Sequence, residues 1–176
     1  MAKKPPKYEL LYREGRDVCG SPFQQFVDFF NNFNRKNCRV LDLGCGQGRD
    51  ALFIARKGHS VFGVDLSETG VSQMLEDARK EGLNVTGMVA DIVEFEPDGE
   101  YDAILLDRVL HMLKDNDDRI AVLEKVCHHT KRGGFILIAD MPKNKGEFVK
   151  FFEGKQEDWE KRKDNKGFLY FQRKLV

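Results

Sequence analysis

The stretch RVLDLGCGQGRDALFIARKGHSVFGVD, residues 39–65, decides the fold that this sequence predicts. Its first residues form an apolar run typical of a buried strand, and a turn with three glycines follows. A helical run from Asp50 to Lys57 comes next and is stopped by Gly58, and a second strand from Ser60 to Val64 ends in Asp65. This order of strand, glycine turn, helix, strand and acid predicts half of a nucleotide-binding βαβ unit.

Two kinds of cofactor fit the glycine turn. Gly46, Gly48 and Ala51 satisfy the dinucleotide fingerprint G-x-G-x-x-G/A, and Asp65 lies about 20 residues on, where an acid binds a ribose diol. This pattern predicts NAD or FAD. The second interpretation starts from Asp42, which lies inside the strand at a place where a buried parallel strand is normally apolar. A buried carboxylate needs a partner, and the α-amino group of a nucleoside that carries an amino acid would supply one.

Several segments of the sequence resemble the class I S-adenosylmethionine-dependent methyltransferases. Asp42-x-Gly44-x-Gly46-x-Gly48 resembles motif I of that family, and Val64-Asp65 resembles the acidic end of its second strand. Ala90-Asp91-Ile92 is similar to the segment that flanks the adenine, and Tyr101 to Asp107 is similar to the fourth strand. The sequence from Leu43 to Arg49 is most similar to that of the small tellurite-resistance and thiopurine methyltransferase branch.

The resemblance implies an α/β fold with a doubly wound, Rossmann-like parallel sheet that is closed by a C-terminal antiparallel hairpin. It also implies S-adenosyl-L-methionine as the cofactor, bound at the carboxyl edge of the sheet. Two further contacts are expected to reach the cofactor from the N-terminal segment. Together, the predicted cofactor-binding residues are Tyr12, Arg16, Asp42, Gly44, Cys45, Gly46, Gln47, Gly48, Asp65, Leu66, Asp91, Ile92, Asp107 and Arg108.

We expect a single globular domain in which an N-terminal helical segment, residues 1–36, precedes the methyltransferase domain of residues 37–176. Ser21-Pro22 predicts a helix start, with the serine as N-cap and the proline at the first position. The helix that follows, from Phe23 to Phe33, has the apolar spacing of a face that packs against the sheet. Residues 8–22 have a second interpretation as a lid that excludes water from the transfer.

Alternating helices and strands along the rest of the chain specify a right-handed, mainly parallel sheet. The predicted elements are a helix from Glu68 to Glu81 capped by Ser67, strands from Asn84 to Ala90 and from Tyr101 to Leu106, a helix from Asn116 to Thr130 broken by Gly133-Gly134, a strand from Phe135 to Ala139, a helix near Lys145 to Glu153, and two final strands from Asp158 to Lys163 and from Phe168 to Leu175. The final pair predicts a hairpin in place of a second mononucleotide half, which favours a methyl donor over a nicotinamide.

The composition of the chain limits the classes of partner that we expect it to bind. The chain is 41% hydrophobic and 33% charged, as in a soluble globular protein. Residues 65–118 carry 4 basic and 15 acidic side chains, which disfavours RNA or DNA because their binding depends on phosphate neutralisation. No run approaches the roughly 20 apolar residues of a membrane span, and the start lacks the apolar core of a secretion signal. We therefore expect a cytoplasmic protein without a membrane or nucleic-acid partner, and the pattern specifies no oligomeric state.

The predicted chemistry needs few catalytic residues, because the donor's methyl group is already activated on a sulfonium and the protein mainly orients the reactants. A hydroxyl or amine acceptor needs a general base, whereas a thiol, with a pKa near about 8.5, needs less help. His111, just past the fourth strand, is the candidate base, and packing among its apolar neighbours is the alternative. Asp107 and Asp140 end adjacent strands, but the Asp-Asn pair of metal-dependent O-methyltransferases is missing, and the four cysteines lack zinc spacing, so no metal is expected.

The acceptor is expected to be a small molecule. After the fourth strand the sequence has neither an N-P-P-Y type segment, used for nitrogens of bases and amides, nor a Pro-Cys pair, used for pyrimidine carbons. The branch resemblance implies a soft sulfur, selenium or tellurium nucleophile, tellurite-like or thiopurine-like, and a hydroxyl, carboxylate or amine is equally compatible with the residues. Two other functions stay open: an NAD-type oxidoreductase and a non-catalytic S-adenosylmethionine-binding protein.

Overall fold

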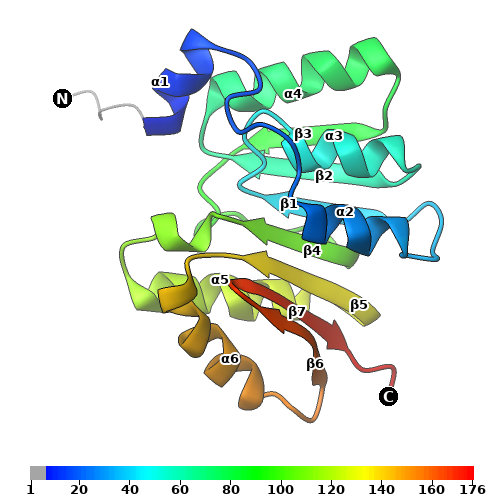
Figure 1. The fold of residues 1–176 in the computed structure, drawn as a ribbon, viewed down its shortest axis with the longest axis vertical. Helices are drawn as coiled ribbons and strands as arrows, with labels where there is room; N and C mark the ends of the chain where they lie inside the picture. The colour runs from blue at the N-terminus through cyan, green and yellow to red at the C-terminus, as the bar shows by residue number, and fades with distance from the viewer. Residues whose placement is uncertain (1–6) are drawn as a thin grey trace.

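A seven-stranded sheet forms the centre of the protein, in the order β3-β2-β1-β4-β5-β7-β6 (Figure 1). The fold comes from a computed structural model that describes residues 7–176, so the first six residues of the expected N-terminal segment lie outside the described part. The strands are β1 (Arg39–Leu43), β2 (Ser60–Asp65), β3 (Val85–Val89), β4 (Tyr101–Asp107), β5 (Thr130–Ala139), β6 (Trp159–Asn165) and β7 (Phe168–Arg173).

The first five strands are parallel, and the chain order reverses between β1 and β4. β7 pairs antiparallel with β5, and β6 pairs antiparallel with β7 at the edge. This arrangement confirms the predicted Rossmann-like sheet closed by a C-terminal hairpin. In open α/β sheets the ligand site lies where the strand order reverses, outside the carboxyl ends of the strands.

Helices cover both faces of the sheet. They are α1 (Lys7–Glu14), α2 (Gln24–Asn31), α3 (Arg49–Arg56), α4 (Glu68–Glu81), α5 (Asn116–His128) and α6 (Lys145–Glu153), with 3₁₀ turns η1 (Leu110–Met112) and η2 (Pro142–Asn144). One buried cluster joins α2, α3 and α4 to the sheet, and a second joins α5 and α6 to it. Alternate residues of a strand therefore enter different clusters, as Val40 and Leu41 of β1 do, because successive side chains point to opposite faces.

Local signals placed several helix ends correctly. Ser67 caps α4 by accepting a hydrogen bond from the Gly70 N–H (3.0 Å), and Gly82 ends the helix with a φ of 64°. These ends depend on residues a few positions apart, so the sequence alone predicts them. The helical segment expected before the first strand is present as α1 and α2. Within residues 7–176, no helix is long and apolar enough to cross a membrane.

The prediction that Gly133-Gly134 separates a helix from the fifth strand is wrong. α5 ends at His128, and both glycines lie inside β5. A Cβ at Gly134 would come within 3.0 Å of the Asp102 carbonyl oxygen of the neighbouring chain segment. Glycine is thus needed here because another stretch of backbone approaches closely, which marks a strand interior as well as a helix stop.

The predicted helix start at Ser21-Pro22 is also wrong. α2 begins at Gln24, after Phe23, and no side chain caps it. The Phe23 ring packs edge-on against Phe168 of β7, with 5.4 Å between the ring centroids. Burial of an aromatic ring against a distant strand fixes the start of this helix in place of the local serine cap.

Candidate active site

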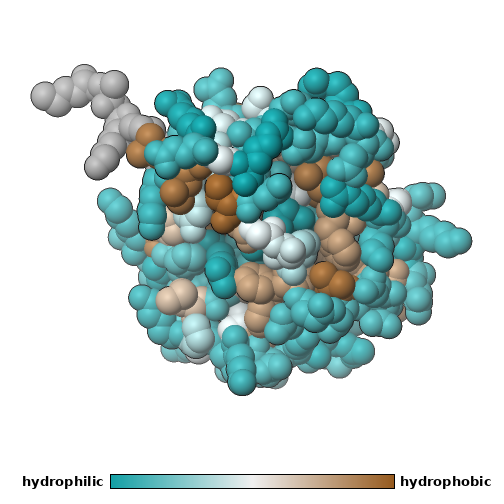
Figure 2. Space-filling model, turned by 45° about the horizontal axis from the view of Figure 1, so that its top comes forward, coloured by the Kyte–Doolittle hydropathy of each residue, from teal (hydrophilic) through white to brown (hydrophobic). Residues whose placement is uncertain are grey.

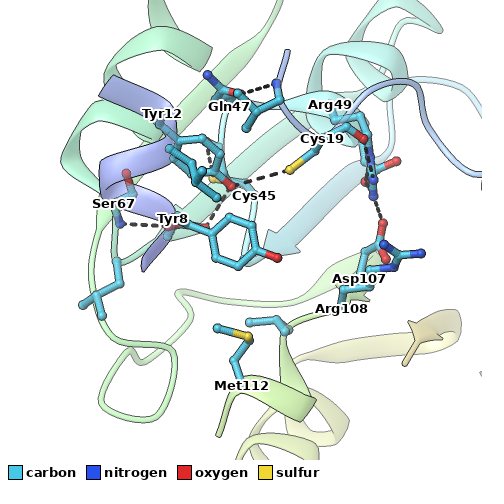
Figure 3. Close-up of a pocket in the computed structure, with 18 of the residues that line it drawn as sticks. Tyr8, Tyr12, Cys19, Cys45, Gln47, Arg49, Ser67, Asp107, Arg108 and Met112 are labelled. Atoms are coloured by element: carbon cyan, nitrogen blue, oxygen red, sulfur yellow. Dashed lines mark hydrogen bonds and ion pairs between the residues drawn. The ribbon is translucent and has the colours of Figure 1, made fainter. Parts of the chain in front are cut away.

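A cavity of about 970 Å³ opens at the carboxyl edge of the sheet, between the glycine turn after β1, the ends of β2 and β4, and the N-terminal segment (Figure 3). Its size is that of a small-molecule site. Apolar side chains that line it and are 38% to 52% exposed are Leu11, Val18, Leu66 and Met112. Figure 2 shows several apolar patches on this face of the molecule, between hydrophilic side chains. Such a wall suits an organic ligand.

Two glycines of the turn are required by the protein's own packing. Gly44 has a φ of 83°, and a Cβ there would lie 2.8 Å from the Val109 side chain. Gly46 has a φ of 51°, and a Cβ there would collide with the hydroxyl of Tyr12. A larger residue at either position would strain the backbone and displace the side chain that closes over it. The turn and the N-terminal segment are thus fitted to one another.

Asp65, at the end of β2, holds the glycine turn in place by hydrogen bonds. Its carboxylate accepts hydrogen bonds from the Gly46 N–H (2.9 Å) and the Ser67 N–H (2.8 Å). Burial raises the pKa of Asp65, and these two N–H groups act against that shift. The side chain also lines the cavity. It therefore positions the turn and offers a carboxylate to a ligand's hydroxyl groups.

A cluster of three acids and one arginine lies beside the turn. Arg49 Nη2 donates to Asp50 Oδ2 (2.8 Å) and to Asp107 Oδ2 at the end of β4. Asp42 of β1 is 2% exposed, and its Oδ2 has no hydrogen-bond partner within the described chain. Burial raises the pKa of Asp42 well above its ordinary value, and nearby Asp50 adds to the shift. An orphaned, buried acceptor of this kind fits a ligand that brings a hydrogen-bond donor.

The N-terminal segment is fastened across the cavity by a buried carboxylate. Glu9 of α1 accepts hydrogen bonds from Ser67 Oγ (2.5 Å), Thr69 Oγ1 (2.7 Å) and the Thr69 N–H (3.2 Å), and it pairs with Arg13 (2.7 Å). The bond from Ser67, with those from Thr69 and Arg13, lowers the pKa of Glu9 to about 2. The ionised carboxylate at the start of α4 also complements the dipole of that helix.

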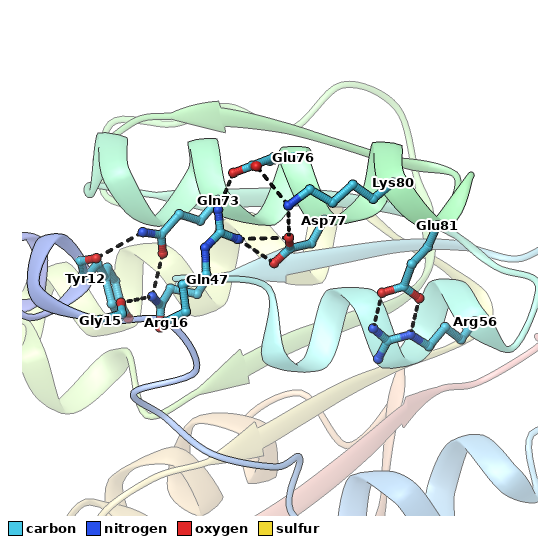
Figure 4. A network of polar contacts seen from close by, with 10 residues as sticks. All are labelled: Tyr12, Gly15, Arg16, Gln47, Arg56, Gln73, Glu76, Asp77, Lys80 and Glu81. Carbon is cyan, nitrogen blue, oxygen red and sulfur yellow. Dashed lines mark hydrogen bonds and ion pairs between the residues drawn. The ribbon is translucent and has the colours of Figure 1, made fainter.

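Two glutamines tie the same segment to the glycine turn and to α4 (Figure 4). Gln47 donates from Nε2 to the Gly15 carbonyl (2.7 Å) and accepts at Oε1 from the Val18 N–H (3.0 Å). Gln73 donates to the Tyr12 carbonyl (3.0 Å). These side chains thereby give hydrogen-bond partners to backbone carbonyl and N–H groups of the N-terminal segment that would otherwise lack them.

The other end of the cavity is formed by Tyr8, Cys19, Arg108 and Met112 (Figure 3). Arg108 has a φ of 52°, unusual for a residue with a side chain, and its N–H donates to the Ala139 carbonyl (2.7 Å). Its guanidinium lies 4.5 Å from the Phe23 ring centroid. Unlike Arg49, it forms no ion pair with any described residue. A cation without a carboxylate partner therefore faces this end.

The Methyltransferase domain family model matches residues 34–173 of this sequence. The chain belongs to this family. A curated relative, the probable S-adenosyl-L-methionine-dependent methyltransferase TehB of Haemophilus influenzae, is 35% identical over 102 residues, which cover 57% of this chain and 35% of the relative. The match thus spans about a third of the length of this relative.

Solved structures share the fold. The crystal structure of TehB from Haemophilus influenzae has a TM-score of 0.75 at 24% identity and covers 96% of this chain and 67% of that one. The N-methyltransferase NodS from Bradyrhizobium japonicum, in complex with S-adenosyl-L-homocysteine, has a TM-score of 0.73 at 12% identity and covers 96% and 99%. At such identities the similarity shows the methyltransferase fold alone.

The structure brings most of the predicted cofactor residues to the cavity. Those that line it are Tyr12, Gly44, Cys45, Gly46, Gln47, Asp65, Leu66, Asp91, Ile92, Asp107 and Arg108. Asp42 and Gly48 do not line it. The Gln47 amide is engaged by the N-terminal segment, and Cys45 is buried with its thiol pKa raised by that burial.

Two predicted residues are placed elsewhere. Arg16 pairs with Glu76 and Asp77 on the outer side of α4 and does not line the cavity, because those carboxylates lie nearer to its loop (Figure 4). His111 also lies outside the lining. Its backbone N–H donates to Asp140 Oδ2 (2.9 Å), and its ring Nδ1 is 3.6 Å from the same oxygen.

Sequence reasoning missed Arg49, Asp50 and Tyr8 as site residues. All three line the cavity. For the first two a signal was available, since adjacent opposite charges directly after a glycine turn lie in the first turn of the helix at the ligand edge. Tyr8 belongs to a short helix whose place over the site depends on the distant Ser67 and Thr69.

Proposed function

We propose that this protein transfers a methyl group from S-adenosyl-L-methionine to a small-molecule acceptor. The observation that carries the proposal is the unpartnered, buried oxygen of Asp42 beneath a glycine turn that also contacts Asp65. A ligand with both a ribose and an amino acid satisfies both acids at once, whereas a dinucleotide satisfies only the second. The name of the TehB relative and the ligand of the NodS structure support this choice of donor.

The residues of the cavity have distinct proposed roles toward the donor. Asp65 accepts hydrogen bonds from the ribose hydroxyls, and Asp91 with Ile92 flanks the adenine, next to the exposed Leu66. Asp42 faces the donor's amino group, directly or through a water. Charge-assisted hydrogen bonds of this kind are about twice as strong as neutral ones.

S-adenosyl-L-methionine supplies, when bound, a methyl group already activated on its sulfonium. The chain's own work is orientation, which contributes up to about 7 to 11 kcal/mol in ideal cases. Residues 8–22 act in this proposal as the lid that keeps water from the transfer, and Glu9 and Gln47 are the contacts that fasten it.

The acceptor we propose is a soft nucleophile, with sulfur, selenium or tellurium as the reacting atom. The described residues that line the cavity include no histidine and no lysine, and the cavity aspartates Asp50, Asp65 and Asp107 are engaged by Arg49 or by backbone N–H groups. A thiol or an oxyanion needs little help with deprotonation, whereas an alcohol or an ammonium needs much. The unpaired guanidinium of Arg108 supports an acceptor that carries a negative charge.

The test is transfer from methyl-labelled S-adenosylmethionine to a panel of thiols, selenite, tellurite and small amines. We expect label in the sulfur, selenium or tellurium products and none in the amines. Transfer to the amines alone would contradict the acceptor class. The Asp65→Ala variant is the control: because it should bind the donor more weakly, it should transfer less label to the same acceptors.

Two outcomes favour the other functions. Tight donor binding with transfer to no acceptor favours a non-catalytic S-adenosylmethionine-binding protein. Saturable NAD binding without donor binding, both measured by calorimetry, favours an oxidoreductase and overturns the proposal.

A further inference from the structure

Three carboxylates share one guanidinium at the edge of the cavity. Asp42 belongs to β1, Asp50 to the first turn of α3 and Asp107 to the end of β4, and Arg49 lies among them. Arg49 binds one oxygen of Asp50 and one of Asp107. The second oxygen of each, and Oδ2 of Asp42, has no hydrogen-bond partner in the described structure. The cluster therefore has three buried acceptors without a partner, and it has fewer positive than negative charges.

The surroundings do not supply the missing charge. The groups that face Asp42 from the packed elements are Asp50 and Arg49 of α3, Asp65 of β2 and the buried thiol of Cys45. The Ala51 N–H acts to lower the pKa of Asp42, which stabilises the charged form without neutralising it. Arg108 forms no ion pair with these acids in the described chain. Carboxylates packed this closely in a protein interior do not all ionise.

We propose that Asp42 and Asp50 together hold one proton in the donor-free protein, and that this proton leaves for solvent when the donor's ammonium group docks on the cluster. The inference rests on the proposed function, since it takes S-adenosylmethionine or its demethylated product as the ligand. An ammonium group has only N–H donors and no acceptor, so it supplies the kind of partner that these buried, unpartnered oxygens lack. Asp50 and Asp107 line the cavity, and Asp42 is buried near Asp50.

The exchange conserves the charge of the cluster. Before binding, the three carboxylates are offset by one guanidinium and one proton, which leaves a net charge of −1. After binding, they are offset by the guanidinium and the ammonium, which leaves the same net charge. Ligand binding therefore adds no further uncompensated charge to the buried cluster. Burial raises the pKa of both Asp42 and Asp50, in agreement with a retained proton.

The proton is counted by calorimetric titration of S-adenosylhomocysteine in buffers with different ionisation enthalpies. At about pH 6.5 the ligand's own α-amino group, with a pKa near 7.7 to 8.0, is already protonated and contributes little. We expect release of between about 0.5 and 1 proton per ligand bound. Methylthioadenosine, which has the nucleoside but no amino acid, is expected to release none.

Two substitutions test which residues hold the proton that is released on binding. Asp50→Asn removes one member of the pair and is expected to reduce the release to a small fraction, while Asp117→Asn, an exposed aspartate in the first turn of α5, leaves it unchanged. Binding of S-adenosylhomocysteine with the same enthalpy in every buffer would overturn the inference and leave the proposed function standing. If neither nucleoside binds, the proposed function fails and the inference falls with it. If Asp50→Asn does not fold, the inference is still tested on the wild-type protein, by the difference in proton release between S-adenosylhomocysteine and methylthioadenosine.

Discussion

Arg49 and Asp107 form an ion pair at the carboxyl edge of the sheet, although 58 residues separate them in the chain. The pair joins the first turn of α3 to the end of β4. Both side chains are largely buried, at 15% and 3% exposure. The contact thus holds together the two elements between which the cavity opens.

Loss of Arg49 should destabilise the fold. Arg49→Met leaves the acids of the cluster without a counter-charge, and we expect the free energy of unfolding at neutral pH to fall by about 3 kcal/mol. Arg49 lowers the pKa of Asp42 and Asp50, so its removal raises these pKa values further, and the loss of stability should shrink as pH falls toward about 4, where the two acids are protonated. Denaturant unfolding at both pH values measures this, with Arg79→Met on the exposed side of α4 as the control. An equal loss at both values would contradict the charge argument.

Asp65 should matter for both the donor and the turn. For Asp65→Ala we expect donor affinity to weaken by about 1 to 3 kcal/mol, because charge-assisted hydrogen bonds are lost. The Gly46 and Ser67 N–H groups also lose their acceptor, so the melting temperature should fall. Calorimetry and thermal unfolding separate the two effects. Glu68→Ala, an exposed acid three residues on, is the control, and unchanged affinity in the Asp65 variant would remove it from the ribose.

Glu9 should hold α1 in place in a pH-dependent way. Its folded pKa of about 2 is below the ordinary 4.5, so its contribution to stability is full above about pH 4.5 and is lost as pH falls through about 2. We expect Glu9→Gln to lose amide protection in residues 7–14, measured by hydrogen exchange, and to lose the pH-dependent part of its stability. Glu14→Gln, an exposed acid at the end of the same helix, should behave like wild type. Equal protection in both variants would show that Glu9 does not fasten the helix.

Arg108 should distinguish acceptors by charge. For Arg108→Gln we expect KM for the anionic thiol mercaptoacetate to rise by about tenfold, because a charge-assisted contact is lost, while KM for neutral 2-mercaptoethanol changes little. Arg79→Gln removes the same charge from an exposed helix face and is the control. A parallel change for both thiols would assign Arg108 to general packing against Phe23.

His111 should be dispensable for the chemical step. Because the structure places it outside the cavity wall and against Asp140, we expect kcat of His111→Gln with a thiol acceptor to stay within about threefold of wild type. Removal of a true general base costs about 10²- to 10⁴-fold. A fall in kcat of that size, with His128→Gln at the exposed end of α5 unaffected, would restore His111 as the base.

Errors in the sequence-based prediction have one physical origin. Gly133-Gly134, Phe23 and Arg16 were interpreted from their neighbours in the chain, but each is controlled by a partner far away. These partners are the Asp102 carbonyl, the Phe168 ring and the acids of α4. A glycine pair, a serine before a proline or an arginine beside a site has several local interpretations, and contacts over long sequence distances select among them.

The sequence by itself determined the strand, glycine turn and helix of residues 39–65, the ends of α4 and the C-terminal hairpin, because periodicity, caps and turns depend on residues a few positions apart. Only the tertiary structure decided which charges meet at the cavity. Asp42, Asp50 and Asp107 come together because β1 and β4 are neighbours in the sheet while lying far apart in the chain. Strand order is a property of the packed core, and no local pattern encodes it.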